Sequence, residues 1–398
     1  MKKMKLSTKV QNLAPSVTLQ AAARAKELKA QGLDVLSLTV GQPDFVTPKN
    51  IEEAAIAAIQ SGEASFYTQS AGIPELRQAI VTYMKENYGL DYSINQTIVT
   101  DGAKFALYLL FQTILDEGDE VIIPVPYWVS YAEQVRLASG VPVFAKTDEE
   151  NGFKVTVEHL DEVLTKRTKA IIINSPSNPT GMIYSKEELL AIGQWAVKNK
   201  VLIVADDIYG RLIYGDNQFT SMAMLTPEIR QNTIVINGVS KTYAMTGWRI
   251  GFAVGDEEII QGMIRLASQS TSNPTAVSQY AAVEALTGSQ ASVEEMRLVF
   301  EERLNRLYPL LCEIPGFKVQ KPQAAFYFFI NISETLQNCG YQEATSFVED
   351  LLNEAHVAVV TGAGFGMDQY IRISYATDWA TLEKSAQRIK AFVESKMQ

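Results

Sequence analysis

Cysteine and histidine are scarce in this chain of 398 residues, which contains two of each. The cysteines, Cys312 and Cys339, and the histidines, His159 and His356, are too few and too scattered for a structural zinc motif. We therefore expect no metal site. So few cysteines also favour a location in the reducing cytoplasm.

Long apolar runs and a surplus of basic charge are absent as well. The first residues, Met-Lys-Lys-Met-Lys, are followed by no apolar segment, and no stretch approaches the roughly 20 apolar residues of a membrane span. With 35 basic and 45 acidic residues the chain has a net charge of −10, which disfavours nucleic acid and anionic membranes as partners. Any anion that the protein binds must be held by a local site.

The chain does contain a long alternation of strand-like and helix-like segments. Such an alternation favours a mostly parallel sheet with helices on both faces. After about residue 287 a long charged helix is followed by short strands and helices, as in an α+β unit. We expect a large doubly wound α/β domain over residues 48–287, a small C-terminal α+β domain over residues 288–398, and an arm, helix and loop over residues 1–47 that join the small domain. The predicted strands of the large domain are 97–100, 120–124, 142–145, 170–174, 201–205, 233–237 and 252–254.

The most informative segment is Ser240-Lys-Thr-Tyr-Ala-Met-Thr-Gly-Trp-Arg-Ile-Gly251, which follows the last long apolar strand. It places Lys241 beyond the carboxyl end of a buried strand, where open α/β sheets bind ligands, and places Arg249 eight residues later. A partly desolvated lysine near other cations loses its proton near neutral pH and can attack a carbonyl to form a Schiff base. Because most loop lysines are solvated, a function for Lys241 depends on the residues around it.

Four other strand ends carry polar, small or aromatic residues. Asp206 could keep its charge by pairing with a pyridinium nitrogen, or it could be a helix N-cap. Asn178 offers a donor and an acceptor, although Asn-Pro is also an ordinary turn sequence. Small residues around Gly102 would let backbone N–H groups approach a phosphate. Trp128 could lie on an aromatic ring or simply fill the core.

The C-terminal part contains a glycine-rich segment and an arginine within a strand. Gly362-Ala-Gly-Phe-Gly366 has the wrong spacing for a dinucleotide fingerprint, and a strand follows it instead of a helix, so we expect a loop. Arg372 alternates with Ile371 and Ile373 in the predicted strand 370–374 and faces the opposite side. It either reaches solvent or binds a carboxylate through two parallel hydrogen bonds.

Taken in order, four of these features resemble the class I aminotransferases of the aspartate aminotransferase superfamily: Asn178-Pro-Thr-Gly181, Asp206-Asp-Ile-Tyr209, the Lys241–Arg249 segment and Arg372. Further segments are similar to the bacterial aspartate aminotransferases that include prephenate-active members: Ala71-Gly-Ile-Pro-Glu-Leu-Arg77, Pro126-Tyr-Trp-Val-Ser-Tyr131 and Gly102-Ala-Lys104. The resemblance covers nearly the whole chain. It implies the fold of the fold-type I pyridoxal-phosphate-dependent transferases.

The resemblance also implies how pyridoxal 5'-phosphate is held. Lys241 would bind it covalently and later move the proton at the substrate Cα. Asp206 would pair with the ring nitrogen, Tyr209 and Asn178 would hydrogen-bond the phenolic oxygen, and Trp128 would stack on the ring. The phosphate contacts would come from Gly102, Ala103, Lys104, Ser240 and Arg249, and from Tyr67 of a second subunit. That last contact implies a homodimer with shared active sites. Ser240 is included because Gly238 stands where many relatives have a phosphate-binding serine.

For the substrate, the resemblance implies that Arg372 binds the α-carboxylate with help from Asn178, Trp128 and the backbone at Gly41. The small domain and the Gly41 loop would close over it. Gln42 departs from the glutamate common in that loop. No counterpart is visible for the arginine with which animal-type enzymes bind a distal carboxylate. Lys104 and Thr18 are the candidates for that contact.

We therefore expect an aspartate aminotransferase that exchanges an amino group between L-aspartate and 2-oxoglutarate by a ping-pong route. Lys104 is the reason for expecting acidic substrates. With the same cofactor, the enzyme could instead act on aromatic amino acids, alanine or prephenate, or eliminate sulfur from a cysteine conjugate as a C–S β-lyase. A non-catalytic ligand sensor is disfavoured, because the chain lacks a basic N-terminal domain and contains the lysine, the aspartate and both arginines of a working site.

Overall fold

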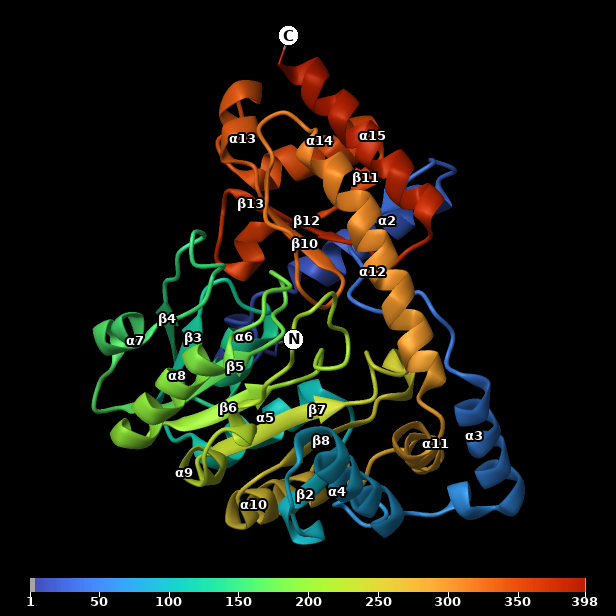
Figure 1. Cartoon of the computed structure of the whole chain (residues 1–398), viewed down its shortest axis with the longest axis vertical. Coiled ribbons are helices and arrows are strands. Elements are labelled where there is room, and N and C mark those ends of the chain that lie inside the picture. Colours follow the sequence, from blue (N-terminus) through green and yellow to red (C-terminus); the bar gives the residue numbers. More distant parts are fainter. Residues whose placement is uncertain (1–3, 398) are drawn as a thin grey trace.

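The computed structural model describes residues 4–397. A seven-stranded sheet occupies the lower part of Figure 1 and a four-stranded sheet occupies the upper part. The long helix α12 (Ala291–Cys312) runs from the lower part to the upper part at one side. We refer below to the lower and upper parts as the large and small units.

The large sheet has the strand order β2-β8-β7-β6-β5-β3-β4. The pairs from β7 to β4 are parallel, whereas β8 runs antiparallel to both of its neighbours. All seven predicted strands are present, with ends shifted by two residues at most, and the prediction of a mostly parallel sheet is confirmed. The strands are β2 (Thr97–Thr100), β3 (Glu120–Pro124), β4 (Val141–Ala145), β5 (Thr168–Asn174), β6 (Leu202–Asp206), β7 (Thr233–Gly238) and β8 (Gly251–Val254).

Helices cover both faces of this sheet, which explains why its central strands β5, β6 and β7 contain uninterrupted apolar runs. One face packs against α5 (Ala103–Ile114), α6 (Ser130–Leu137) and α10 (Glu257–Ser268). The other face is covered by α4 (Pro74–Tyr88), α8 (Lys186–Asn199), α9 (Pro227–Gln231) and α11 (Ala276–Thr287), and α3 (Lys49–Ser61) packs on the outer side of α11. A short helix α7 (Val157–Val163) lies at the β4 side.

The small sheet is antiparallel, with the order β12-β13-β10-β9. Its strands are β9 (Lys318–Val319), β10 (Tyr327–Asn331), β12 (Val360–Thr361) and β13 (Tyr370–Ser374), and its core includes side chains from α12, α13 (Ser333–Cys339), α14 (Ala344–Ala355) and α15 (Trp379–Lys396). The chain's N-terminal part joins this unit, because β1 (Leu36–Ser37) pairs in parallel with β11 (Val357–Ala358) and α2 (Val17–Ala30) packs beside them.

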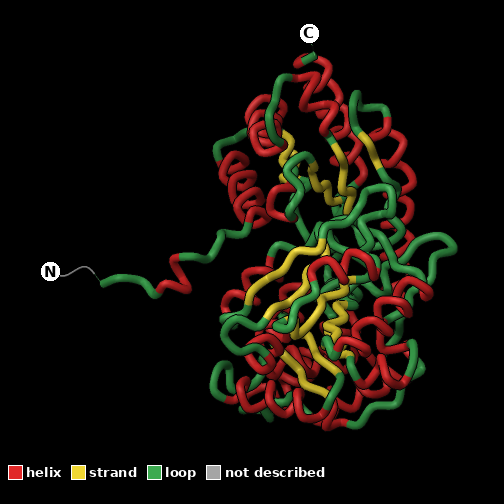
Figure 2. Tube along the Cα trace, turned by 90° about the vertical axis from the view of Figure 1, so that its left-hand side faces the viewer, coloured by secondary structure: helices red, strands yellow, loops and turns green. Residues whose placement is uncertain are grey.

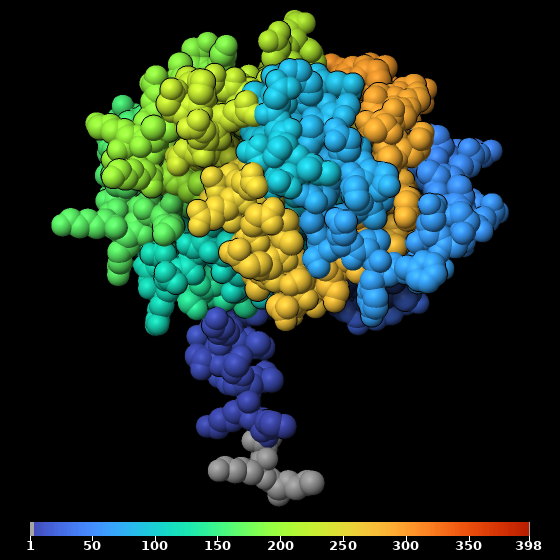
Figure 3. All heavy atoms as spheres, turned by 90° about the horizontal axis from the view of Figure 1, so that it is seen from below, coloured from blue at the N-terminus to red at the C-terminus, as the bar shows by residue number. Residues whose placement is uncertain are grey.

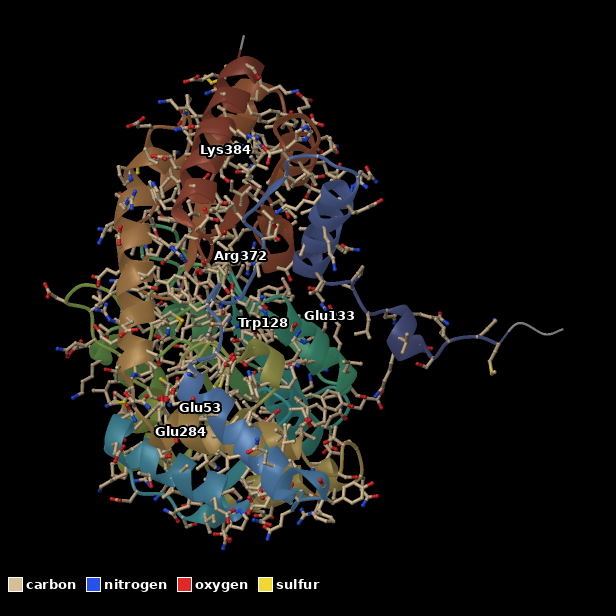
Figure 4. All side chains as sticks on the ribbon, turned by 90° about the vertical axis from the view of Figure 1, so that its right-hand side faces the viewer. Glu53, Trp128, Glu133, Glu284, Arg372 and Lys384 are labelled. Atoms are coloured by element: carbon tan, nitrogen blue, oxygen red, sulfur yellow. The ribbon has the colours of Figure 1, made fainter. Side chains whose placement is uncertain are left out.

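Before α2, the chain forms an arm that includes the short helix α1 (Thr8–Gln11), which buries no residue. Figures 2 and 3 show this arm extending away from the body of the molecule. Its contacts with α6 include a hydrogen bond from the Ala14 N–H to Glu133 Oε2 at 3.2 Å, and Figure 4 shows Glu133 on the side of the body that faces the arm. The apolar side chains of Met4, Leu6 and Val10 are exposed on it.

The glycine-rich segment differs slightly from the expected loop. Residues Gly362–Phe365 form a 3-10 helix, because the Thr361 hydroxyl accepts a hydrogen bond from the Ala363 N–H and Gly366 ends the turn with a positive φ of 86°. Between residues 4 and 397, no helix is long and apolar enough to cross a membrane. Within the same range, no group of three or more His, Cys, Asp and Glu side chains is arranged to hold a metal ion.

Candidate active site

A cavity of about 390 Å³ lies where the carboxyl ends of β5, β6 and β7 face the small sheet. Segments far apart in the sequence contribute to it, including α2, α5, the Gly41 loop and β13. Figure 4 shows Arg372 in the upper unit and Trp128 in the lower unit, the two units that the cavity separates. The predicted site residues that line the cavity are Thr18, Gly41, Ala103, Lys104, Trp128, Asn178, Asp206, Tyr209, Ser240, Lys241, Arg249 and Arg372, whereas Gly102 and Tyr67 do not.

Lys241 lies just after β7, as the strand pattern predicts. Its Nζ donates a hydrogen bond to the carbonyl oxygen of Gly41 at 2.5 Å, across 200 positions of sequence. Burial lowers the pKa of Lys241 to about 8, and the positive charges of Arg249 and Arg372 act in the same direction. A substantial fraction of this amine is therefore neutral near pH 7.5, which is the state that can attack a carbonyl.

Asp206 is the last residue of β6 and is buried. Its Oδ2 accepts a hydrogen bond from the Tyr131 hydroxyl at 2.6 Å, and its Oδ1 accepts one from the Ile208 N–H at 3.3 Å. Burial raises the pKa of Asp206 to about 6, against the opposing effects of these hydrogen bonds and of the Lys241 charge. The residues after Asp206 form a turn, so the alternative role as a helix N-cap is not what the structure shows.

Arg372 is the largest side chain that is fully buried. Its Nη1 donates to Asn178 Oδ1 at 3.0 Å and its Nη2 donates to the Thr39 carbonyl oxygen at 2.9 Å, while its Cζ lies 4.5 Å from the centroid of the Tyr327 ring. Its Nε has no partner, and no carboxylate of residues 4–397 forms an ion pair with it. A buried cation that lacks an anionic partner is costly for the fold. The arrangement suits an anionic ligand that enters from the cavity.

The N-terminal end of α5 and Arg249 together form an anion-binding corner. The Arg249 guanidinium donates to the backbone oxygens of Thr246 and Asp101 at 3.0 and 3.2 Å. Gly102, with φ at 85°, allows this approach, because a Cβ there would lie 2.3 Å from Arg249 Nη2. Likewise, a Cβ at Gly251 would lie 2.2 Å from the Ala103 nitrogen. The free N–H groups of the first helical turn, beside a guanidinium, fit the phosphate of the expected cofactor.

Lys104 and Trp128 meet on one wall of the cavity. The Lys104 Nζ lies 4.8 Å from the centroid of the Trp128 ring, and the Trp128 ring packs edge-on against Tyr131 at 5.3 Å. Burial lowers the pKa of Lys104, and the charge of Arg249 lowers it further. Thr18 lines the same cavity and hydrogen-bonds the Ser16 hydroxyl at 2.9 Å. This wall combines a cation, a hydroxyl and an indole face.

Sequence reasoning missed two tyrosines that contact predicted site residues. Tyr131 lies in the quoted Pro126–Tyr131 motif, three positions after Trp128, but the sequence alone assigned it no partner. Tyr327 lies under Arg372, and its hydroxyl is 2.9 Å from that of Tyr209. No local pattern marks Tyr327, because its place depends on the pairing of β10 with β13.

The chain is similar to known proteins over nearly its whole length. The family model described as aminotransferase class I and II matches residues 33–389. An asparagine–oxo-acid transaminase of Streptococcus mutans is 57% identical over 98% of this chain and 99% of its own length. An aspartate aminotransferase of Bacillus sp. strain YM-2 is 54% identical, with the same coverage of both chains.

Solved structures of aminotransferases are also similar to this chain over nearly its whole length. The aspartate aminotransferase of Rhizobium meliloti has a TM-score of 0.94 at 38% identity and covers 98% of this chain and 99% of its own. The aspartate aminotransferase of Thermus thermophilus with maleate has a TM-score of 0.92 at 42% identity and covers 98% of this chain and all of its own. Both the sequence relatives and the structural neighbours therefore span the large unit, the small unit and the cavity between them.

Proposed function

Since the chain belongs to the class I and II aminotransferases and is a pyridoxal-phosphate-dependent transaminase, we propose that it transfers the amino group between L-aspartate and 2-oxoglutarate. The products are oxaloacetate and L-glutamate, formed by a ping-pong route. The observation that carries this proposal is a pair of cations, Arg372 and Lys104, that line one cavity on opposite units of the molecule. Two separated cations suit substrates with two carboxylates.

The residues of the cavity fit pyridoxal phosphate. Bound there, the cofactor supplies an electron sink for the carbanion that forms when the substrate Cα loses its proton. Asp206 would hold the ring nitrogen, and a positive partner would return its carboxylate to the ionised form. Tyr209 and Asn178 would bind the phenolic oxygen and Trp128 would cover the ring. The phosphate would be held by Gly102, Ala103, Lys104, Ser240 and Arg249.

The chain's own groups perform the remaining tasks. Lys241, which is partly neutral at physiological pH, would hold the cofactor through its Nζ and would move the proton at the substrate Cα. Arg372 and Asn178 orient the α-carboxylate, because the Asn178 side chain already fixes the guanidinium. The Gly41 loop covers the cavity next to Lys241 and would exclude water from it.

A second candidate substrate is L-asparagine. The observation in its favour is the 57% identity to a relative named as an asparagine–oxo-acid transaminase. Neutral polar side chains that could bind a carboxamide, Thr18 and Gln42, line the cavity together with Lys104. Prephenate is a weaker alternative, since relatives named as probable aspartate/prephenate aminotransferases are 44% identical.

Half-reactions test the substrate assignment. The cofactor-loaded protein is mixed with L-aspartate, L-asparagine, L-alanine or L-phenylalanine without an acceptor, and conversion of the cofactor to its amino form is followed by absorbance. We expect the highest rate with L-aspartate. Conversion with L-asparagine but not with L-aspartate would replace the first proposal by the second. Lys241→Ala should abolish turnover, and unchanged turnover in that variant would refute the catalytic assignment of Lys241.

We also propose a homodimer in which Tyr67 of each subunit reaches the phosphate site of the other. The exposure of apolar and aromatic side chains in and after α3 supports this, because Tyr67 is 92% and Phe66 is 75% exposed and Ile56 and Ile59 are also exposed. Light scattering should give twice the chain mass. Tyr67→Phe should weaken cofactor binding without dissociating the dimer.

We also propose that residues 48–287 form a large domain and residues 288–398 a small domain, which residues 1–47 join, and that the protein is cytoplasmic. The assignment of residues 1–47 to the small domain is supported by the packing of α2 and β1 on the small unit. Both cysteines, Cys312 and Cys339, are free, which is compatible with a reducing cytoplasm.

A further inference from the structure

Arg372 shares one face of the small sheet with a cluster of aromatic and polar residues. In β13, Tyr370 and Arg372 point to the same side because they are two positions apart. Their direct partners across the strand pair are Asn331 and Phe329 of β10. The rings of Phe329 and Tyr370 stack with centroids 5.0 Å apart and an interplanar angle of 14°. Whatever contacts this cluster from the large unit therefore touches the immediate neighbours of Arg372.

A turn of the large unit makes that contact. Residues 148–153 follow β4 and lie against the cluster through two side chains. Glu149 Oε2 accepts hydrogen bonds from the Tyr370 hydroxyl and from Asn331 Nδ2, both at 2.7 Å. The buried ring of Phe153 packs edge-on against Phe329 at 5.9 Å and against Tyr370 at 5.6 Å. We call residues 148–153 the clasp.

The clasp is itself fastened to the large unit. Immediately after it, Lys154 Nζ pairs with Glu188 Oε1 of α8 at 2.5 Å, and the Val155 N–H donates to the Tyr184 hydroxyl at 2.9 Å. Within the clasp, the Phe153 N–H donates to the Asp148 carbonyl oxygen at 2.9 Å, and Phe153 has a positive φ of 58°. A non-glycine residue keeps this backbone conformation only where its surroundings hold it. The clasp is thus a defined link between the two units.

We propose that Glu149 and Phe153 are positioning residues that set the place of Arg372 relative to Lys241 and Asp206. This inference rests on the proposed binding of the substrate α-carboxylate by Arg372. Lys241 and Asp206 belong to the large unit whereas Arg372 belongs to the small unit, so the distance across the cavity depends on contacts between the units. The clasp contacts Phe329, which pairs with Arg372 on the neighbouring strand, and Tyr370, which lies two positions before Arg372.

A weaker clasp should reduce the affinity for the substrate carboxylate and leave the affinity for the cofactor nearly unchanged. The Glu149 carboxylate accepts two hydrogen bonds, and such bonds are stronger when the acceptor is charged. Glu149→Gln keeps the shape but removes the charge, so Tyr370 and Arg372 should shift on their strand. Misplacement by about 1 Å can cost a catalytic site up to about a hundredfold. The residues proposed to hold the cofactor belong to the large unit, so cofactor affinity should be spared.

The experiment compares Glu149→Gln and Glu149→Ala with a matched control, Glu150→Gln. Glu150 is the exposed neighbour, and no hydrogen bond of its side chain occurs within residues 4–397. Succinate serves as the carboxylate probe and is titrated into the cofactor-loaded protein, and pyridoxal phosphate is titrated into the cofactor-free protein. Hydrogen exchange of a peptide that covers β13 reports the strand directly.

In Glu149→Gln we expect the succinate Kd to rise about tenfold, the pyridoxal phosphate Kd to change less than about twofold, and exchange in β13 to increase. Glu149→Ala should show a larger effect and Glu150→Gln none. For L-aspartate, kcat/KM should fall more than kcat. If Arg372→Lys loses succinate affinity, then an unchanged succinate Kd in Glu149→Gln, or an equal loss of succinate and cofactor affinity, would overturn the proposal.

Arg372→Lys separates this inference from the function on which it rests. If Arg372→Lys binds succinate as tightly as the wild type, the carboxylate-binding role of Arg372 is wrong. Hydrogen exchange then still decides on the clasp, because β13 must loosen in Glu149→Gln and not in Glu150→Gln if Glu149 positions that strand. Unchanged exchange in Glu149→Gln overturns the clasp whatever the role of Arg372.

Discussion

Replacement of Asp206 by asparagine should stabilise the cofactor-free protein at neutral pH, although the same change should abolish its activity. Burial raises the pKa of the Asp206 carboxyl from its ordinary value of 3.8 to about 6. Each pKa unit corresponds to about 1.36 kcal/mol, so ionised Asp206 costs the folded state about 3 kcal/mol. Asparagine has the same shape and no charge, and it can hydrogen-bond both the Tyr131 hydroxyl and the Ile208 N–H.

The stabilisation depends on pH because the Asp206 carboxyl binds its proton more tightly in the folded protein than in the unfolded chain. Between pH 3.8 and about 6 the folded protein retains a proton that the unfolded chain has released. The contribution of Asp206 to stability therefore falls as the pH rises through this window, and it stays low above it. The free energy of unfolding of Asp206→Asn should equal that of the wild type below about pH 3 and exceed it by about 3 kcal/mol above pH 7.

Urea unfolding of the cofactor-free proteins at pH 5, 6 and 7.5 measures this difference. Asp216→Asn is the control, because Asp216 is exposed and its replacement should change the free energy of unfolding by less than about 0.5 kcal/mol. An Asp206→Asn protein no more stable than the wild type at pH 7.5 would refute the reasoning. With pyridoxal phosphate bound, the advantage should disappear, because the ring nitrogen would then pair with the carboxylate of the wild type alone.

Three further predictions concern the same site. Tyr131→Phe removes the 2.6 Å hydrogen bond to the Asp206 carboxylate and should raise the pKa of Asp206 by about one unit. Carbon NMR of labelled aspartate, with the Asp206 signal assigned from Asp206→Asn, measures this pKa. An unchanged pKa would show that the hydrogen bond does not stabilise the ionised carboxylate. In the cofactor-free protein, the rate at which Lys241 reacts with an amine-directed reagent should rise with pH, with a midpoint near its pKa of about 8. Arg249→Gln should move that midpoint to higher pH, because it removes a positive charge that lowers the pKa of Lys241. Mass spectrometry of the modified peptide measures both midpoints. Gly102→Ala would place a Cβ 2.3 Å from Arg249 Nη2, so its pyridoxal phosphate Kd should rise at least about tenfold, and an unchanged Kd would contradict the phosphate assignment.

The sheet was predictable because a strand that is buried on both faces is an uninterrupted run of apolar residues in the sequence. Strands β5, β6 and β7 each contain an uninterrupted run of three or four apolar residues, at 170–173, 202–205 and 234–236, as expected for a sheet that helices cover on both sides. The direction of β8 was not predictable. It has four residues, and nothing in so short an apolar run distinguishes antiparallel from parallel pairing.

The candidate site was predictable only to the extent that it is built from strand ends. Asp206 ends an apolar strand, Asn178 and Lys241 come shortly after one, and parallel strands bring their carboxyl ends to one edge. The partners of these residues depend on tertiary register instead. Tyr131 reaches Asp206 from a helix 75 positions earlier, and Tyr327 lies under Arg372 because β10 pairs with β13 in one particular register. Local patterns contain no information about either contact.

The balance of charge around the cavity explains how an acidic chain can bind anionic ligands. The protein has a net charge of −10, yet the cavity is lined by Lys104, Lys241, Arg249 and Arg372 against Asp206. Burial lowers the pKa of both lysines and of Arg372, so these charges are held in an unfavourable environment by carbonyl oxygens and aromatic rings. A phosphate and a substrate carboxylate would supply the missing negative charge. Binding of these two anions would therefore stabilise the site, and without them the fold carries the electrostatic cost of the buried cations.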